Sequence, residues 1–148
     1  MIYLASDHGG FKLKEQIREH LVAQGKFVAD LGPEQLNPKD DFPDFVLPLA
    51  EKIAKEQGSL GIVLCRNGAG VEVAANKVNG IRAVLSWDPL HAASTRADDD
   101  ANVLALPADY IDSEKAFAVV DSWLATPYKK EERFERRLKK IESEENER

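Results

Sequence analysis

Residues 60–65, LGIVLC, form a nearly unbroken apolar run with no alternation of polar and apolar positions. Such a run is typical of a parallel strand that is covered by helices on both faces. It leads directly into a glycine-rich stretch, RNGAG at 66–70, and then into a short helical segment. The run therefore predicts the central strand of a layered α/β domain, with a glycine-rich loop at its carboxyl end.

Short apolar runs alternate with helix-patterned segments along the rest of the chain. The other predicted strands are residues 2–6, 26–31, 81–86 and 102–106. The predicted helices are residues 11–24, 43–57, 71–77, 88–98, 113–124 and about 130–146.

This alternation predicts one α/β domain over residues 1–148. The expected fold is a Rossmann-like three-layer αβα domain with a five-stranded parallel sheet, right-handed crossovers and an extra C-terminal helix. The expected strand order is 2-1-3-4-5, which makes the first and third strands neighbours at the switch point. Open α/β sheets bind their ligands at such a point. The loops that leave these two strands, at residues 6–10 and 65–70, are therefore the places where we expect a site.

Composition narrows the class of protein. The chain has 148 residues, a net charge of −6 and one cysteine. It lacks an apolar run of the roughly 20 residues that would cross a bilayer, and its N-terminus lacks the pattern of a signal peptide. A single cysteine suits a reducing compartment, and an acidic chain without a basic face is a poor partner for nucleic acid. We expect a cytoplasmic protein that binds neither membrane nor nucleic acid.

Cys65 ends the predicted central strand. It is either a small buried apolar residue or a reactive thiol, because the N-terminus of a helix favours the thiolate. The backbone N–H groups of the loop that follows it could converge on one anion, or the loop could simply be a tight turn. The loop is neither a complete GxGxxG fingerprint nor a Walker A sequence, which argues against a nucleotide-binding flavodoxin-like module. The loop residues are Arg66, Asn67, Gly68, Ala69 and Gly70.

Asp7 and His8 leave the first strand at the same predicted edge of the sheet. They either hydrogen-bond a polyol there, or Asp7 caps the helix that starts near Gly10. We expect His20 to be solvated, whereas the sequence does not decide whether His91 faces the site.

Positive charge collects near the C-terminus, where residues 129–140 hold seven Lys/Arg and three Asp/Glu. A small basic patch on an acidic body suits capture of a small anion. Arg133 and Arg137 lie four residues apart on one helix face. They either bind an anion or form ion pairs with neighbouring glutamates. An apolar stripe beside them must pack on another surface, either this chain or a second subunit; its residues are Phe134, Leu138 and Ile141.

Several motifs together resemble the ribose-5-phosphate isomerase B family, which has the galactose-6-phosphate isomerase subunits as relatives. The resemblance covers nearly the whole chain. It is carried by SDHGGFKLK at 6–14, DFPDF at 41–45, GAG at 68–70 with AANK at 74–77, GIRA at 80–83 and NVLA at 102–105. It implies a homodimer or a dimer of dimers with shared active sites, and neither a metal nor an organic cofactor. It also implies the interconversion of an aldose phosphate and a ketose phosphate through a cis-enediolate.

The resemblance also assigns roles to residues. Cys65 matches the base that moves a proton between C1 and C2, and the backbone of residues 66–70 matches the anion hole for the enediolate. Asp7 and His8 match the pair that contacts the sugar and its phosphate end. Two phosphate-binding arginines, contributed across the subunit interface, are matched by Arg133 and Arg137.

The chain departs from the family pattern at several of these positions. Asp98 replaces the usual ring-opening histidine, and Asp99 replaces a substrate-contacting asparagine. A carboxyl with an ordinary pKa near 3.9 is a poor acid at neutral pH, although repulsion among successive carboxylates favours protonation. Asp109 replaces a phosphate-binding arginine, Phe134 replaces a histidine, and Arg66 and Asn67 stand where glycine and threonine are usual.

One positive charge is thus lost at position 109 and one is gained at position 66, so Arg66 is a candidate for the missing phosphate contact. We expect an aldose–ketose isomerase, with ribose 5-phosphate as the best single substrate. The alternatives are another four- to six-carbon sugar phosphate and a non-catalytic or partner-dependent relative of the family.

Overall fold

The computed structural model describes residues 1–147. Its strands are β1 (Ile2–Ser6), β2 (Val28–Asp30), β3 (Leu60–Cys65), β4 (Ala83–Leu85) and β5 (Val103–Pro107). Its helices are α1 (Phe11–Ala23), α2 (Pro43–Lys55), α3 (Ala69–Ala75), α4 (Pro89–Asp99), α5 (Ser113–Ala125) and α6 (Glu132–Asn146).

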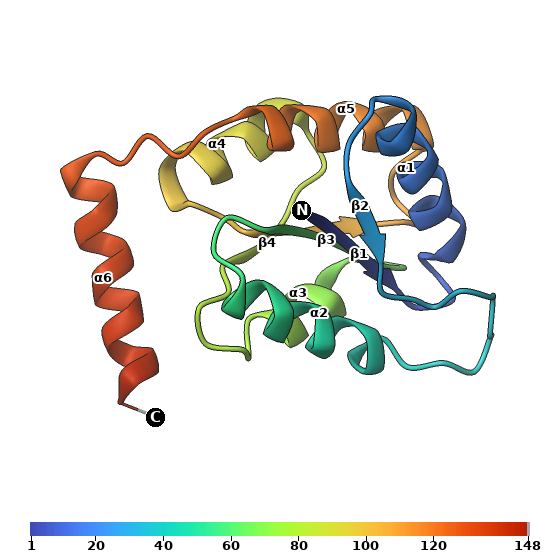
Figure 1. The fold of residues 1–148 in the computed structure, drawn as a ribbon, viewed down its shortest axis with the longest axis horizontal. Helices are drawn as coiled ribbons and strands as arrows, with labels where there is room; N and C mark the ends of the chain where they lie inside the picture. Colours follow the sequence, from blue (N-terminus) through green and yellow to red (C-terminus); the bar gives the residue numbers. More distant parts are fainter. Residues whose placement is uncertain (148) are drawn as a thin grey trace.

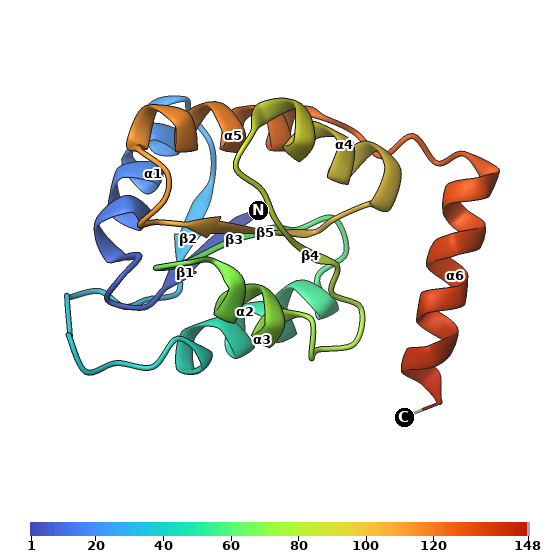
Figure 2. The same ribbon diagram turned by 180° about the vertical axis from the view of Figure 1, so that it is seen from behind.

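The helices cover both faces of one parallel sheet, which confirms the predicted α/β class. Helices α1, α4 and α5 lie on one face, and α2 and α3 lie on the other (Figures 1 and 2). The core accordingly has two apolar layers, one on each side of the sheet. Trp123 in α5 is the largest fully buried side chain. Helix α6 stands beside this three-layer body (Figure 1).

The strand order is β2-β1-β3-β5-β4, so the predicted order 2-1-3-4-5 is wrong for the last two strands. All five residues of β5 are buried, whereas β4 has only three residues and two of them are partly exposed. A fully apolar strand belongs inside a sheet, and a short, half-exposed one belongs at its edge. The chain therefore skips one position after β3 and returns to fill it with β5. The predicted switch point is unaffected, because β1 pairs with β3 from Ile2 opposite Leu60 to Ser6 opposite Leu64.

His20 is not simply solvated, as the sequence predicted. Its Nε2 lies 2.9 Å from Oδ1 of Asp121, and its ring stacks on Phe117 with 4.3 Å between centroids. The histidine therefore fastens α1 to α5. Helical periodicity alone did not reveal this contact, because the partner residues lie about 100 positions further along the chain.

A buried lysine connects α1 to β2. Lys14 is fully buried, and its Nζ lies 2.6 Å from Asp30 and 2.8 Å from Glu15. The same Nζ donates to the carbonyl oxygen of Pro33 at 3.0 Å. A buried ammonium is stable only when its donors are matched in this way. The network therefore fixes the end of β2 and the start of the loop that follows it.

The same network predicts a loss of stability in acid. Burial alone would raise the pKa of Glu15, but hydrogen bonds and charge from Lys14 and Arg18 outweigh it and lower the pKa from 4.5 to about 2. Ionised Glu15 therefore stabilises the fold above pH 4.5, and this contribution is lost as the pH falls from 4.5 towards about 2.

We expect Glu15→Gln to flatten the dependence of the free energy of unfolding on pH in that window, as measured by urea titrations between pH 2.5 and 6. The control is Glu51→Gln, which removes an exposed carboxylate on α2 and should leave the dependence unchanged. Equal slopes for wild type and Glu15→Gln would contradict the assignment.

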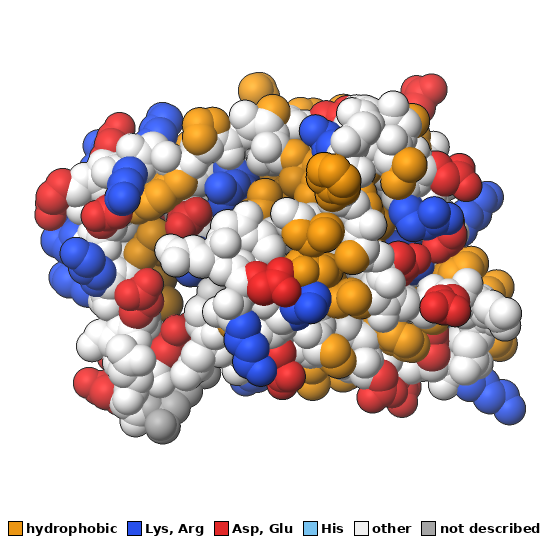
Figure 3. Space-filling model, in the orientation of Figure 1, with side chains coloured by type: hydrophobic (Ala, Val, Ile, Leu, Met, Phe, Trp, Pro, Cys, Tyr) orange, Lys and Arg blue, Asp and Glu red, His pale blue; other side chains and the backbone are white. Residues whose placement is uncertain are grey.

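Helix α6 makes an incomplete contact with the body. Phe134 is buried near its start, and near its end Glu145 accepts the backbone N–H of Gly80 at 3.1 Å. Ile141, the last residue of the predicted apolar stripe, is 56% exposed. Acidic and basic side chains are intermixed over α6 (Figure 3). Part of the apolar stripe thus has no partner in the described part of this chain.

Candidate active site

The polar loops after β1 and β3 lie side by side at the carboxyl edge of the sheet. The backbone N–H of Asp7 donates to the carbonyl of Leu64 at 3.3 Å, so the pairing of the two strands continues past the end of β1. This register places Asp7 beside Cys65, and both residues are buried. The predicted neighbourhood of Asp7, His8 and the loop at residues 66–70 is therefore present in the structure.

The Cys65 thiol faces its own loop. Its Sγ lies 3.7 Å from Oδ1 of Asn67, to which it donates, and the same oxygen accepts the N–H of Ala69 at 3.0 Å. One N–H of the predicted anion hole is therefore already used. The N–H groups of Gly68 and Gly70 have no acceptor within residues 1–147. An incoming oxyanion could bind to these two groups.

Two glycines of this loop are required by close packing. Gly68 has φ +74°, and a Cβ there would lie 2.9 Å from Leu85 and 3.0 Å from the backbone nitrogen of Pro107. A Cβ on Gly70 would lie 2.6 Å from the ring of Phe42. Any side chain at either position would displace the turn. The loop is thus held in one shape between β4, β5 and the segment that precedes α2.

Asp7 and His8 form hydrogen bonds with different parts of the chain. Oδ1 of Asp7 accepts the N–H of Gly10 at 3.0 Å and so braces the turn that leads into α1. Gly10 is the N-cap of α1, and within residues 1–147 no side-chain hydrogen bond caps that helix, so Asp7 does not cap it. His8 is held by Asp40, whose Oδ1 lies 2.7 Å from Nδ1 of the ring and accepts the backbone N–H of His8 at 2.9 Å. Sequence reasoning missed Asp40. It is one of two adjacent aspartates in a polar loop, and only a contact across 32 residues distinguishes it from the other.

Arg66 and Asp109, the two residues whose charge departs from the family pattern, face each other. Nη1 of Arg66 lies 3.6 Å from Oδ2 of Asp109, and the backbone N–H of Asp109 donates to the carbonyl of Arg66 at 2.9 Å. The contact follows from the strand order, because β5 lies next to β3 and brings its loop alongside. The aliphatic part of Arg66 lies against Gly9, where a Cβ would collide with it. Arg66 therefore lies over the loop that carries Asp7 and His8.

The other predicted site residues lie elsewhere in the chain. Helix α4 ends at Asp99, before β5 begins, so Asp98 and Asp99 are at the amino edge of the sheet, opposite Cys65. Partial burial raises the pKa of the Asp99 carboxyl, the charge of Asp98 raises it further, and Arg137 opposes both. Asp98, Asp99 and Arg137 thus form a group of their own.

Arg133 is half exposed on α6. It pairs with Glu131 at 3.1 Å and lies over the ring of Phe134 at 4.7 Å. The ion-pairing alternative for this arginine is therefore realised in the isolated chain. His91, which the sequence left undecided, is placed after β4, where its Nδ1 lies 2.9 Å from Oγ of Ser86.

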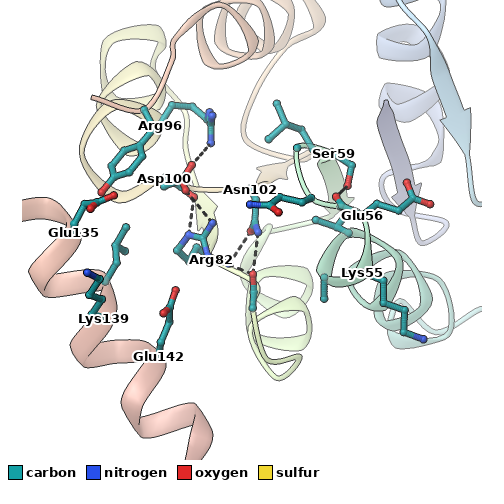
Figure 4. A pocket seen from close by; sticks show the side chains of 18 residues that line it. Lys55, Glu56, Ser59, Arg82, Arg96, Asp100, Asn102, Glu135, Lys139 and Glu142 are labelled. Carbon is teal, nitrogen blue, oxygen red and sulfur yellow. Dashed lines mark hydrogen bonds and ion pairs between the residues drawn. The ribbon is translucent and has the colours of Figure 1, made fainter. Parts of the chain in front are cut away.

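A groove of about 740 Å³ separates α6 from the amino edge of the sheet. Glu135, Lys139 and Glu142 line it from α6, and Arg82 and Asp100 line it from the body (Figure 4). Nε of Arg82 donates to the carbonyl of Asp100 at 2.7 Å, and their side chains form an ion pair at 3.2 Å. Arg82 and Asp100 thus pair with each other, and the residues that line the groove include neither Cys65 nor any other residue of the predicted site.

No cluster of three or more His, Cys, Asp or Glu side chains in residues 1–147 is placed to hold a metal ion. No helix in this range is long and apolar enough to cross a membrane.

An open parallel sheet with polar loops at its switch point defines a class of α/β proteins that bind small ligands at that edge. Within this class, residues 2–141 match the sequence profile of the Ribose/Galactose Isomerase family, and the chain belongs to that family. The family resemblance carried by the motifs is confirmed.

Relatives and solved structures agree with this assignment. A probable ribose-5-phosphate isomerase B of Mycoplasma pneumoniae is 44% identical over 127 residues, which cover 86% of this chain and 84% of the relative. Ribose-5-phosphate isomerase B of Mycobacterium tuberculosis is 37% identical over 137 residues, covering 93% and 85%. The crystal structure of ribose-5-phosphate isomerase B from Mycoplasma genitalium with bound ribulose-5-phosphate is 40% identical. It superposes with a TM-score of 0.95 over 99% of this chain and 97% of that one.

Proposed function

We propose that this chain is an aldose–ketose isomerase that interconverts ribose 5-phosphate and ribulose 5-phosphate through a cis-enediolate. Membership of the family and the names of the relatives support the reaction. The observation that carries the proposal is the placement of a buried thiol beside Asp7, at the head of a loop with two unused N–H groups. A base next to an anion hole is the arrangement that proton transfer beside a carbonyl needs.

In the proposed reaction Cys65 acts as the base. Its thiolate removes the proton from C2 of the open-chain aldose, which leaves the negative charge on O1 of the enediolate. The proton on O2 then passes to O1, and the thiol returns its own proton to C1, which yields the ketose and restores the thiolate. The N–H groups of Gly68 and Gly70 stabilise the negative oxygen of the enediolate, within the predicted anion hole of residues 66–70. Asp7 and His8 bind the hydroxyls of the sugar and its phosphate end.

A second subunit completes the proposed site. Asp98 and Asp99 lie at the edge of the sheet opposite Cys65 and cannot act on the same substrate within one chain. In a homodimer or a dimer of dimers, Asp98 of one subunit would open the sugar ring bound by the other. Asp99 would contact the sugar, and Arg133 and Arg137 would bind its phosphate. The exposed Ile141 on α6 supports the idea that this helix packs on a second copy.

Direct turnover tests the substrate. We expect the purified chain to convert ribose 5-phosphate faster than other four- to six-carbon sugar phosphates, and alkylation of its single cysteine to abolish the activity. Activity on another sugar phosphate alone would reject ribose 5-phosphate as substrate. No activity on the whole panel would favour a partner-dependent or non-catalytic relative. A functional thiol at the site is consistent with a reducing compartment, and we place the reaction in the cytoplasm.

The Arg66–Asp109 pair predicts opposite effects for its two members. If Arg66 binds the substrate phosphate, Arg66→Ala should raise KM about tenfold with a smaller change in kcat. Asp109→Asn should lower KM, because it removes the carboxylate that competes for the guanidinium. Steady-state kinetics measures both, with Lys26→Ala as a control for the loss of one exposed positive charge. An unchanged KM in Arg66→Ala would reject the phosphate contact.

A further inference from the structure

His8 is held by a carboxylate that no motif in the sequence indicates. Asp40 lies in the loop between β2 and α2, and its Oδ1 takes two hydrogen bonds from His8, one from the backbone and one from the ring. A single oxygen that binds both groups fixes the position of the residue and the rotation of its ring. No hydrogen bond joins Nε2, on the opposite side of the ring, to residues 1–147.

Asp40 is also costly for the fold. Its side chain is only 6% exposed, and its second oxygen, Oδ2, is buried without a hydrogen-bond partner in the described chain. A buried carboxylate with an unmatched oxygen destabilises a protein. An asparagine could accept from the backbone N–H of His8 through its amide oxygen without bringing a negative charge into the interior. The charge at position 40 therefore calls for an explanation other than loop packing.

The ring nitrogens of histidine provide that explanation. A carboxylate only accepts hydrogen bonds, so a 2.7 Å contact with Nδ1 requires the proton to be on Nδ1. An asparagine at the same place could either donate or accept and would not select one form of the ring. Selecting the tautomer of a functional histidine is a recognised task of a neighbouring carboxylate.

We propose that Asp40 is a positioning residue that keeps the proton on Nδ1 of His8 and so reserves Nε2 for the substrate. This inference rests on the proposed function, because it assumes that His8 binds the sugar phosphate. Asp40 itself does not touch the substrate. The contact joins the loop before α2 to the loop after β1, and thereby couples the segment that carries Phe42 to the sugar site.

The test compares two isosteric changes in the same loop. Asp40→Asn removes the buried carboxylate, and Glu34→Gln removes an exposed one and serves as the matched control. We expect Asp40→Asn to lower kcat/KM for ribose 5-phosphate roughly ten- to hundredfold. Glu34→Gln should stay within about twofold of wild type. In a His8→Ala background the further change Asp40→Asn should have little effect, because the two residues act as one unit.

Nitrogen-15 NMR of His8 in the free protein separates positioning from a general loss of structure. In the wild type we expect the chemical shift of a protonated Nδ1, and in Asp40→Asn a shift toward a mixture of tautomers while the melting temperature changes little. An unprotonated Nδ1 in the wild type would overturn the proposal. Wild-type kcat/KM in Asp40→Asn would also overturn it. So would a double variant, His8→Ala with Asp40→Asn, whose loss of kcat/KM equals the product of the two single losses.

The same measurement distinguishes the failure of this proposal from the failure of the proposed function. If the enzyme turned over no ribose 5-phosphate, the NMR experiment would be repeated with inorganic phosphate as the probe. A phosphate-dependent change at Nε2 that is lost in Asp40→Asn would support the positioning role. No change at Nε2 in the wild type would overturn it.

Discussion

Cys65→Ala is expected to lower kcat for ribose 5-phosphate by about a hundred- to ten-thousandfold, the range over which a positioned general base accelerates proton transfer. Cys65 is 4% exposed and packs in the apolar core, and within residues 1–147 its one side-chain hydrogen bond is the bond to Asn67. Alanine fits the same space, so KM and the melting temperature should change little. Steady-state kinetics and thermal unfolding of the same preparation measure the two effects separately.

Treating the wild type and Cys65→Ala with a thiol reagent provides a second test of the role of Cys65. Because the chain has a single cysteine, a thiol reagent acts on Cys65 alone, and wild-type protein treated with it should match Cys65→Ala in residual activity. The treated Cys65→Ala protein is the control and should show no further loss. If Cys65→Ala retained full turnover, the base would have to be another group at this edge, and the proposed mechanism would fail.

The sequence predicts those parts of the site that lie next to a recognisable strand, and it does not predict the parts that depend on contacts between distant segments. Cys65 ends one strand with an obvious apolar run, and the loop at residues 66–70 follows it. Asp7 follows another such strand, and parallel strands bring their carboxyl ends to one edge of the sheet. The Arg66–Asp109 contact could not be predicted from the expected strand order, because it depends on β5 lying next to β3. The apolar character of residues 103–107, VLALP, favours an interior position for this strand, but strand order in the chain alone does not indicate it.

Asp40 was beyond the reach of pattern reasoning for a different reason. Its role comes from a contact between two loops, and neither hydrophobic periodicity nor a capping motif constrains such a contact. The same holds for His20 and Asp121, whose pairing depends on how α1 packs against α5. Both contacts depend on how segments far apart in the sequence pack together, and residue type alone does not indicate that packing.

The predicted site residues lie in two separate groups within one chain, and this separation can be tested by mixing variants. Cys65 and Asp7 are at the carboxyl edge of the sheet, whereas Asp98 and Arg137 are associated with its amino edge and α6. If each active site combines one group from each of two subunits, two inactive variants should restore each other. A mixed dimer of Cys65→Ala with the double variant Asp98→Ala/Arg137→Ala has both lesions in one site and none in the other.

We therefore expect a mixture of these two proteins, unfolded and refolded together, to regain about a quarter of the wild-type kcat/KM, because half of a random mixture is mixed dimers and each has one intact site. The matched control pairs Cys65→Ala with Asp7→Ala. These lesions affect the same group of residues, so every site in the mixed dimer stays damaged and the activity should not return. Activity of the first mixture that merely equals the average of its components would contradict the shared site. It would require Asp98 and Arg137 to act, if at all, apart from Cys65.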